Sequence, residues 1–250
     1  MNTPEKMRKI VSQMVCGLLV VLLAFPTIAV AQPKQGKWSI IPKVGVTISK
    51  VSGDKIFYLQ EGGGGGVSAQ ESNSKYKAGF LGGVDVQYQV TSVFGVSAGV
   101  FYQQQGTRFD DFTMLGADEK GGESVGSQRL HLGYLAVPVM VSGYVAPGLA
   151  LKAGVQPSWL MNAEHCYETS SFTVDDDGHR TYGTSHDVEA DVKSICRSFN
   201  LSIPVGISYE YQNVVLDARY TIPLTKTYKD DYGDGRNSTF LFTVGYRIEL

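Results

Sequence analysis

Polar and apolar residues alternate with a period of two along most of the chain after Gln32, whereas the 3.6-residue period of an amphipathic helix is nearly absent. In the last segment the two faces separate clearly. One face carries Phe240, Phe242, Val244, Tyr246, Ile248 and Leu250, and the other carries Leu241, Thr243, Gly245, Arg247 and Glu249. This pattern predicts β-strands with one apolar and one polar face.

Eight segments carry the alternation, and we predict each of them to be a strand. They span residues 38–50, 76–90, 94–109, 128–145, 149–163, 199–211, 214–229 and 240–250. The fourth segment is apolar on both faces between residues 134 and 141, so the pattern does not show which of its faces points inward. Five prolines lie inside these segments, where each removes one ladder hydrogen bond, and we expect local bulges or kinks there. They are Pro42, Pro138, Pro157, Pro204 and Pro223.

The connections between these segments alternate in length. Residues 91–92, 146–148 and 212–213 fit tight turns, whereas the other four connections are longer and rich in Gly, Asp, Glu and Ser, at 51–75, 110–127, 164–195 and 230–236. An even strand number with short turns at one end and long loops at the other predicts an all-β, eight-stranded antiparallel up-and-down transmembrane β-barrel. The alternative is a soluble barrel of lipocalin type, whose apolar face would point inward.

The first 31 residues resemble a cleavable export signal. Lys6, Arg8 and Lys9 precede an apolar stretch at 10–25, and Ala29-Val30-Ala31 fits the cleavage rule. We therefore expect a signal peptide at 1–31, a barrel domain at 32–250 and a location in the bacterial outer membrane. A retained membrane anchor is the alternative. Val15 argues against a lipoprotein at Cys16, because a small residue is expected before a lipidated cysteine.

The composition agrees with this class and excludes another. Formal net charge is −2, which gives no basis for a nucleic-acid partner, and mean hydropathy is −0.07. A low hydropathy suits an exported barrel, because no segment is then apolar enough to stop in the inner membrane. The expected partners are outer-membrane lipid and an extracellular or envelope protein, and we expect no cofactor. Aromatic residues near both ends of the strands predict two girdles.

Taking the apolar face as outside assigns a set of polar residues to the lumen. Eight of them are ionisable: Lys43, Asp85, Lys152, Glu210, Asp217, Arg219, Arg247 and Glu249. Gln87, Gln103 and Gln156 share this face. An eight-stranded barrel has room only for side chains, so we expect these charges to pair and close the lumen. The functional alternative is a narrow ion path or a proton-linked site.

The connection at 164–195 carries further candidates. We expect Cys166 and Cys196 to meet at the barrel rim and form a disulfide, because the export compartment is oxidising; two free thiols are the alternative. The same connection carries the candidate residues for an extracellular binding loop, which are Asp175, Asp176, Asp177, His179 and His186.

Catalytic and metal motifs are weak. Gly95-Val-Ser-Ala-Gly99 fits the G-x-S-x-G pattern but lies in an alternating strand with no helix after it, so we expect no catalytic Ser97. The acidic runs at 175–178 and 230–235 lack the D-x-D-x-D-G spacing of calcium loops. His165, His179 and His186 lack the tight ligand pair of a zinc site. We expect no catalytic residues and no metal.

Three segments resemble the PorT-like, or porin-like, outer-membrane β-barrel domain family. They are Tyr134-Leu-Ala-Val-Pro138, Gly154-Val-Gln-Pro-Ser-Trp-Leu160 and Gly245-Tyr-Arg-Ile-Glu-Leu250. Ala136 replaces the acidic residue that the family commonly has. The resemblance implies the barrel fold over most of the mature chain and permits an accessory role in a secretion system. The sequence favours a barrel that presents loops for a binding, adhesion or envelope-structural role without catalysis; a narrow porin or a barrel hydrolase are further alternatives.

Overall fold

The computed structural model describes residues 35–52, 56–59, 67–70, 74–116, 120–229 and 232–250. The expected signal peptide at 1–31 lies outside these residues. In chain order the strands are β1 (Trp38–Ser52), β2 (Ile56–Leu59), β3 (Val67–Gln70), β4 (Ser74–Lys75), β5 (Lys77–Gln89), β6 (Phe94–Phe109), β7 (Phe112–Leu115), β8 (Gly121–Ala136), β9 (Val139–Ala146), β10 (Leu149–Val174), β11 (Arg180–Tyr182), β12 (His186–Asp191), β13 (Phe199–Tyr211), β14 (Val214–Pro223), β15 (Arg236–Tyr246) and β16 (Ile248–Glu249).

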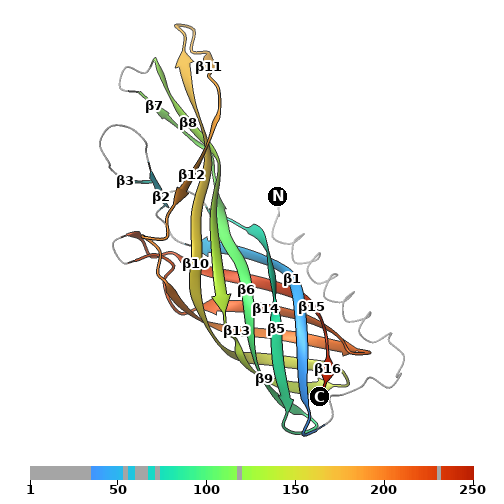
Figure 1. Cartoon of the computed structure of the whole chain (residues 1–250). Helices are drawn as coiled ribbons and strands as arrows, with labels where there is room; N and C mark the ends of the chain where they lie inside the picture. The colour runs from blue at the N-terminus through green and yellow to red at the C-terminus, as the bar shows by residue number, and fades with distance from the viewer. Residues whose placement is uncertain (1–34, 53–55, 60–66, 71–73, 117–119, 230–231) are drawn as a thin grey trace, which may run out of the picture. The chain divides into compact units, whose positions relative to one another are not determined.

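The main sheet closes on itself, as Figure 1 shows. Antiparallel ladders run in the order β1, β5, β6, β8 with β9, β10, β13, β14 and β15, and β15 pairs again with β1. β8 and β9 are two parts of one barrel strand, because Phe101↔Ala136 and Ala98↔Val139 keep the same register on β6. The ring therefore passes through eight strands, and the predicted antiparallel barrel is confirmed.

The apolar face of each barrel strand lies outside. On β1, Val44 is 68% exposed, whereas Lys43 is only 2% exposed and points into the lumen. Aromatic pairs lie near the two ends of the barrel strands: Trp38 and Tyr88 are tilted to each other at 4.8 Å, and Trp159 and Phe199 meet edge to face at 5.8 Å between ring centroids. An apolar exterior is stable only in an apolar surrounding, so the soluble lipocalin alternative is wrong.

Each of the five in-strand prolines lies at a gap in one of its two ladders. The β1–β15/β16 ladder is interrupted beside Pro42, and the β10–β13 ladder is interrupted beside Pro204. Pro138 lies in the break between β8 and β9, Pro157 lies at the same gap on β10, where its carbonyl accepts the N–H of Val137 at 2.9 Å, and Pro223 ends β14. The expected bulges are not at these residues. Bulges occur in β10 instead, between Leu160 and Asn162 and between Cys166 and Glu168.

The short turns have the expected form. Gln212 and Asn213 both have positive φ, 46° and 68°, as a two-residue hairpin loop requires, and Gly148 has a φ of 73° in the turn before β10. In the part of the chain that the structure describes, no helix is long and apolar enough to cross a membrane.

Two connections that the sequence predicts as loops are largely strand. β8 already begins at Gly121, and β10 continues to Val174, so both extend beyond the barrel ring. With β7, β11 and β12 they form a sheet at the long-loop end, visible above the ring in Figure 1. We call this sheet the arm; it comprises residues 112–116, 120–130 and 161–191. In contrast, residues 224–229, predicted as strand, are irregular because Pro223 ends β14.

Candidate functional site

A network of five charged side chains fills the middle of the lumen. Asp217 on β14 accepts hydrogen bonds from Lys43 at 3.3 Å and Lys152 at 3.1 Å. Its second oxygen accepts one from Arg219 at 2.5 Å. Asp85 on β5 accepts from Lys43 at 2.7 Å and from Arg219 at 3.1 Å. All five are buried and come from four strands, so the network ties opposite walls of the barrel together.

A second ion pair lies nearer the short-turn end. Arg247 donates to Glu210 at 2.7 Å and to Gln87 at 3.4 Å, and Gln87 donates to the Tyr144 hydroxyl at 3.0 Å. Glu249, which the alternation assigned to the lumenal network, is exposed and is not part of it. The chain still pairs with β1 through β16 after Arg247, but Ile248 and Glu249 are both exposed, so the alternation of buried and exposed side chains ends at Arg247.

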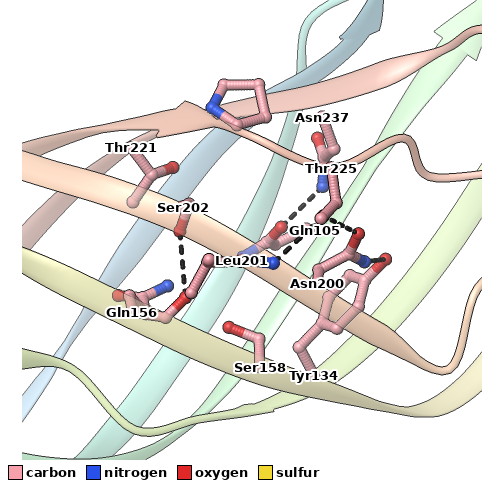
Figure 2. A pocket seen from close by; sticks show the side chains of 11 residues that line it. Gln105, Tyr134, Gln156, Ser158, Asn200, Leu201, Ser202, Thr221, Thr225 and Asn237 are labelled. Carbon is pink, nitrogen blue, oxygen red and sulfur yellow. Dashed lines mark hydrogen bonds between the residues drawn. The ribbon is translucent and has the colours of Figure 1, made fainter.

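Above the charges lies a layer of neutral polar side chains around a small cavity, shown in Figure 2. Asn200 donates to the Tyr134 hydroxyl at 2.8 Å and accepts from Thr225 at 2.9 Å, and Asn237 donates to Gln105 at 2.5 Å. The cavity measures about 30 Å³, which accommodates only about two water molecules. It is too small for an organic ligand.

The long-loop end of the lumen is closed by an apolar cluster. Its members are Val51, Phe109, Leu130, Leu132, Tyr134, Leu160, Ala163, Val192, Cys196 and Tyr228. Val192, Ile195, Cys196 and Tyr228 come from connections between strands and pack on the side chains that the barrel strands contribute to this cluster. Together the charge network, the neutral layer and this apolar cap fill the lumen at three successive heights.

The expected disulfide is absent, since both cysteines are free thiols. Cys166 lies in the arm, where its register partners are Arg129 and Glu189. Cys196 lies in the apolar cap, where its backbone forms an isolated antiparallel β-bridge with Tyr228. The expectation was wrong because β10 continues beyond the rim and carries Cys166 into the arm. Burial raises the pKa of Cys196 to about 12, and burial with the nearby Glu189 raises the pKa of Cys166.

The predicted loop residues occupy different parts of the arm. Asp175 stabilises the turn at 175–179, which is the tip of the arm. Its carboxylate accepts a hydrogen bond from the backbone N–H of His179 at 2.7 Å, and Nδ1 of the His179 ring lies 3.4 Å from its other oxygen. Asp176 and Asp177 are exposed at the same tip. His186 instead begins β12 opposite Thr169, so the structure does not group it with the tip residues.

The described residues contain no group of three or more His, Cys, Asp and Glu side chains arranged to hold a metal ion. Ser97 lies within β6, opposite Gln87 and Met140, with its side chain in the lumen. It is not on the strand-to-helix turn that a nucleophilic serine of this motif needs.

A closed antiparallel barrel with an apolar exterior and a polar interior defines a transmembrane β-barrel. The family described as outer membrane protein beta-barrel domain matches residues 30–229, and the chain belongs to this family. Its location is the bacterial outer membrane. The long-loop end, with the arm, is therefore extracellular, and the short turns are periplasmic.

Solved structures with a similar arrangement include the attachment invasion locus protein Ail of Yersinia pestis, at 18% identity over 86% of this chain and 100% of Ail, with a TM-score of 0.39. Neisserial surface protein A is 13% identical over 84% of this chain and 97% of its own, with a TM-score of 0.41. The outer membrane protease OmpT from Escherichia coli is 9% identical over 86% and 97%, with a TM-score of 0.35. No curated protein matches the chain.

Loss of the Asp217 charge is expected to destabilise the barrel strongly. Asp217→Asn keeps the shape but leaves Lys43, Lys152 and Arg219 with Asp85 as their only carboxylate, at a cost of about 3 to 5 kcal/mol. Glu249→Gln makes the same charge change at an exposed position and should alter stability by less than about 0.5 kcal/mol. Urea unfolding in phospholipid vesicles measures both; equal stability of the two variants would contradict the network's role.

The free energy of unfolding is also expected to fall at acidic pH, because His165 is buried in its neutral form. This residue lies in the arm, outside the membrane. Its ring packs between Phe109 and Tyr167, its Nε2 has no partner, and burial lowers its pKa to about 4. The unfolded chain binds the proton near pH 6.5, so stabilisation of about 3 kcal/mol is present above pH 6.5 and is lost as pH falls toward 4. His165→Gln should remove this part of the acid dependence. Amide exchange in the upper part of β10, compared at pH 7 and 4.5, checks this; an equal acid effect in both proteins would refute it.

Proposed function

We propose that this protein is a membrane-anchored binding protein whose arm presents a recognition surface to an extracellular or envelope protein. The observation that carries the proposal is that β8 and β10 each run from the barrel wall into the arm as a single strand and remain paired there, with two bulges in the ladder between them. The barrel thereby holds the arm at a fixed height and orientation. Such preorganisation lowers the ordering cost of binding.

Side-chain contacts within the arm support a defined surface. Arg180 stacks over the Phe172 ring at 4.9 Å, and Phe172 packs on Tyr182 at 5.6 Å between ring centroids. Thr169 donates to Glu123 at 2.5 Å across the β8–β10 ladder. These contacts pair the hairpin of β10 and β11 with β8, so the tip at 175–179 is carried on a packed sheet.

The arm also offers backbone hydrogen-bonding groups. Among the described strands, β7 and β11 end the order of the sheet, and β12 pairs only with β10. An exposed sheet edge can accept an added strand from a partner, with main-chain bonds giving affinity and side chains giving selectivity. A protein partner therefore fits this surface better than a small molecule does.

The filled lumen argues against a porin, because no described layer leaves room for a solute. The PorT-like resemblance makes an accessory role in secretion the alternative, in which the partner would be a component of the secretion machinery. A knockout followed by a survey of secreted proteins separates this from an adhesion role: loss of secreted proteins supports the former, and an unchanged set supports the latter.

Shortening the arm provides the direct test. Thr169 and His186 are register partners, so replacing residues 170–185 with Asn-Gly closes a two-residue hairpin and removes the tip and β11. Replacing Gln212-Asn213 with Asn-Gly makes a matched change at the periplasmic end. A photo-crosslinking residue is placed at position 181, which is exposed on the arm. The same residue at position 107, which is buried in the barrel, measures background crosslinking.

We expect the photo-crosslinking residue at position 181 to capture one extracellular or envelope protein on intact cells, and the residue at position 107 to capture none. In the shortened variant, cell-surface binding should fall about tenfold or more, while the heat-dependent gel mobility of a folded barrel is kept. The periplasmic-turn variant should bind as the wild type does. Unchanged binding after removal of residues 170–185 would contradict the proposal.

A further inference from the structure

The outer edge of β12 is open, because among the described strands β12 pairs only with β10. At the end of this ladder the backbone N–H of Val192 donates to the carbonyl of Ala163 at 3.0 Å. Hydrogen-bonded and non-hydrogen-bonded pairs alternate along an antiparallel ladder, so every second residue of β12 directs its N–H and C=O away from β10. The residues that direct these groups to the open edge are Asp187, Glu189 and Asp191.

The side chains of these same residues belong to an acidic face of the arm. The register pairs on this face are Glu164↔Asp191, Cys166↔Glu189 and Glu168↔Asp187. Two of the three pairs therefore place carboxylates directly opposite each other, which is destabilising in a sheet. Burial and the carboxylates of Glu189 and Glu164 raise the pKa of the Cys166 thiol between them. Basic groups bound along this face would relieve the repulsion.

The basic residues beside this face leave the open edge unoccupied. Arg129 and His131 pair with β10 from β8, so β10 separates them from β12. Lys193, just beyond β12, donates through Nζ to the backbone carbonyl of Met161 at 2.7 Å. A surface hollow of about 490 Å³ lies at this end of β12, lined by residues 161–164, Glu189, Asp191 and Lys193. It has room for a long basic side chain.

The arrangement of the carboxylates indicates the kind of cation that fits. They follow two strands in a row, and among the described residues they form no group that could hold a metal ion. A row of carboxylates along an open strand edge is complementary to a row of basic side chains along a second strand.

We propose that the open edge of β12 binds an extended segment of a protein partner in which every second residue is Lys or Arg. The backbone groups of Asp187, Glu189 and Asp191 pair with an added antiparallel strand, and the residues opposite them place their side chains on the acidic face. The residues in between lie over Val188 and Ala190, which are half-buried on the other face, and this suits β-branched side chains. The assignment rests on the proposed binding role of the arm and adds the place and chemistry of one partner segment.

The test measures, by fluorescence anisotropy, binding of the labelled peptide Thr-Lys-Thr-Lys-Thr-Lys-Thr to the full mature chain in phosphatidylcholine nanodiscs. The wild type should bind this peptide. The isomer Thr-Thr-Lys-Lys-Lys-Thr-Thr should bind about tenfold more weakly, because its consecutive lysines point to both faces of an added strand. Methyl groups on the backbone nitrogens of the lysines should abolish binding, since these amides face β12, whereas methyl groups on the internal threonine nitrogens should not.

Matched charge variants locate the site on the protein. Asp187→Asn combined with Glu189→Gln should weaken binding of the alternating peptide by about tenfold while the heat-dependent gel mobility of a folded barrel is kept. Asp176→Asn combined with Asp177→Asn makes the same charge change at the exposed tip and should leave the affinity unchanged. The variant that lacks residues 170–185 keeps β12 and should also bind the peptide as the wild type does.

Equal binding of the two isomers, or of the two methylated peptides, would overturn the proposal, because the acidic face would then attract cations without adding a strand. Equal affinity of the wild type and the Asp187/Glu189 variant would overturn it as well. The proposed function fails separately: absence of peptide binding together with loss of cell-surface binding in the shortened variant would remove only the β12 site. Peptide binding together with unchanged cell-surface binding in that variant would remove only the role of the tip.

Discussion

The closed barrel depends on the ion pairs that the carboxylate of Asp217 forms in the lumen. This carboxylate accepts hydrogen bonds from Lys43, Lys152 and Arg219, and through Lys43 and Arg219 it is linked to Asp85. Burying three cations and two carboxylates is unfavourable unless each finds its partners, and the geometry here provides them. The result joins walls of the barrel that are distant in sequence.

Room for these long side chains comes from glycines on neighbouring strands. A Cβ on Gly245 would lie 2.6 Å from Lys43 Cγ, one on Gly99 would lie 2.2 Å from a carboxylate oxygen of Asp85, and one on Gly206 would lie 3.0 Å from Arg219 Cγ. The high glycine content is thus partly explained by the charged lumen. With the interior occupied in this way, interactions with other molecules fall to the outer wall and the arm.

The period-two pattern was sufficient to predict the ring, because strands that face lipid on one side and packed polar groups on the other must alternate strictly. It failed where that constraint ends. Above the membrane, β10 continues through polar residues to Val174, and water on its outer face no longer demands apolar side chains. The predicted disulfide failed for the same reason, since a loop that began at Glu164 would have kept Cys166 at the rim. The gaps beside Pro42 and Pro204 depend on the pairing of distant strands, which one sequence does not reveal.

Single-channel recording of the purified protein in planar bilayers tests the closed lumen most directly. The three filled layers predict no steady conductance of porin size at neutral pH, either for the wild type or for the variant that lacks residues 170–185, because the charge network and the apolar cap remain in place. A stable open channel in the wild type would contradict the account. It would show that the lumen, and not the outer surface and arm, is the working part of the protein.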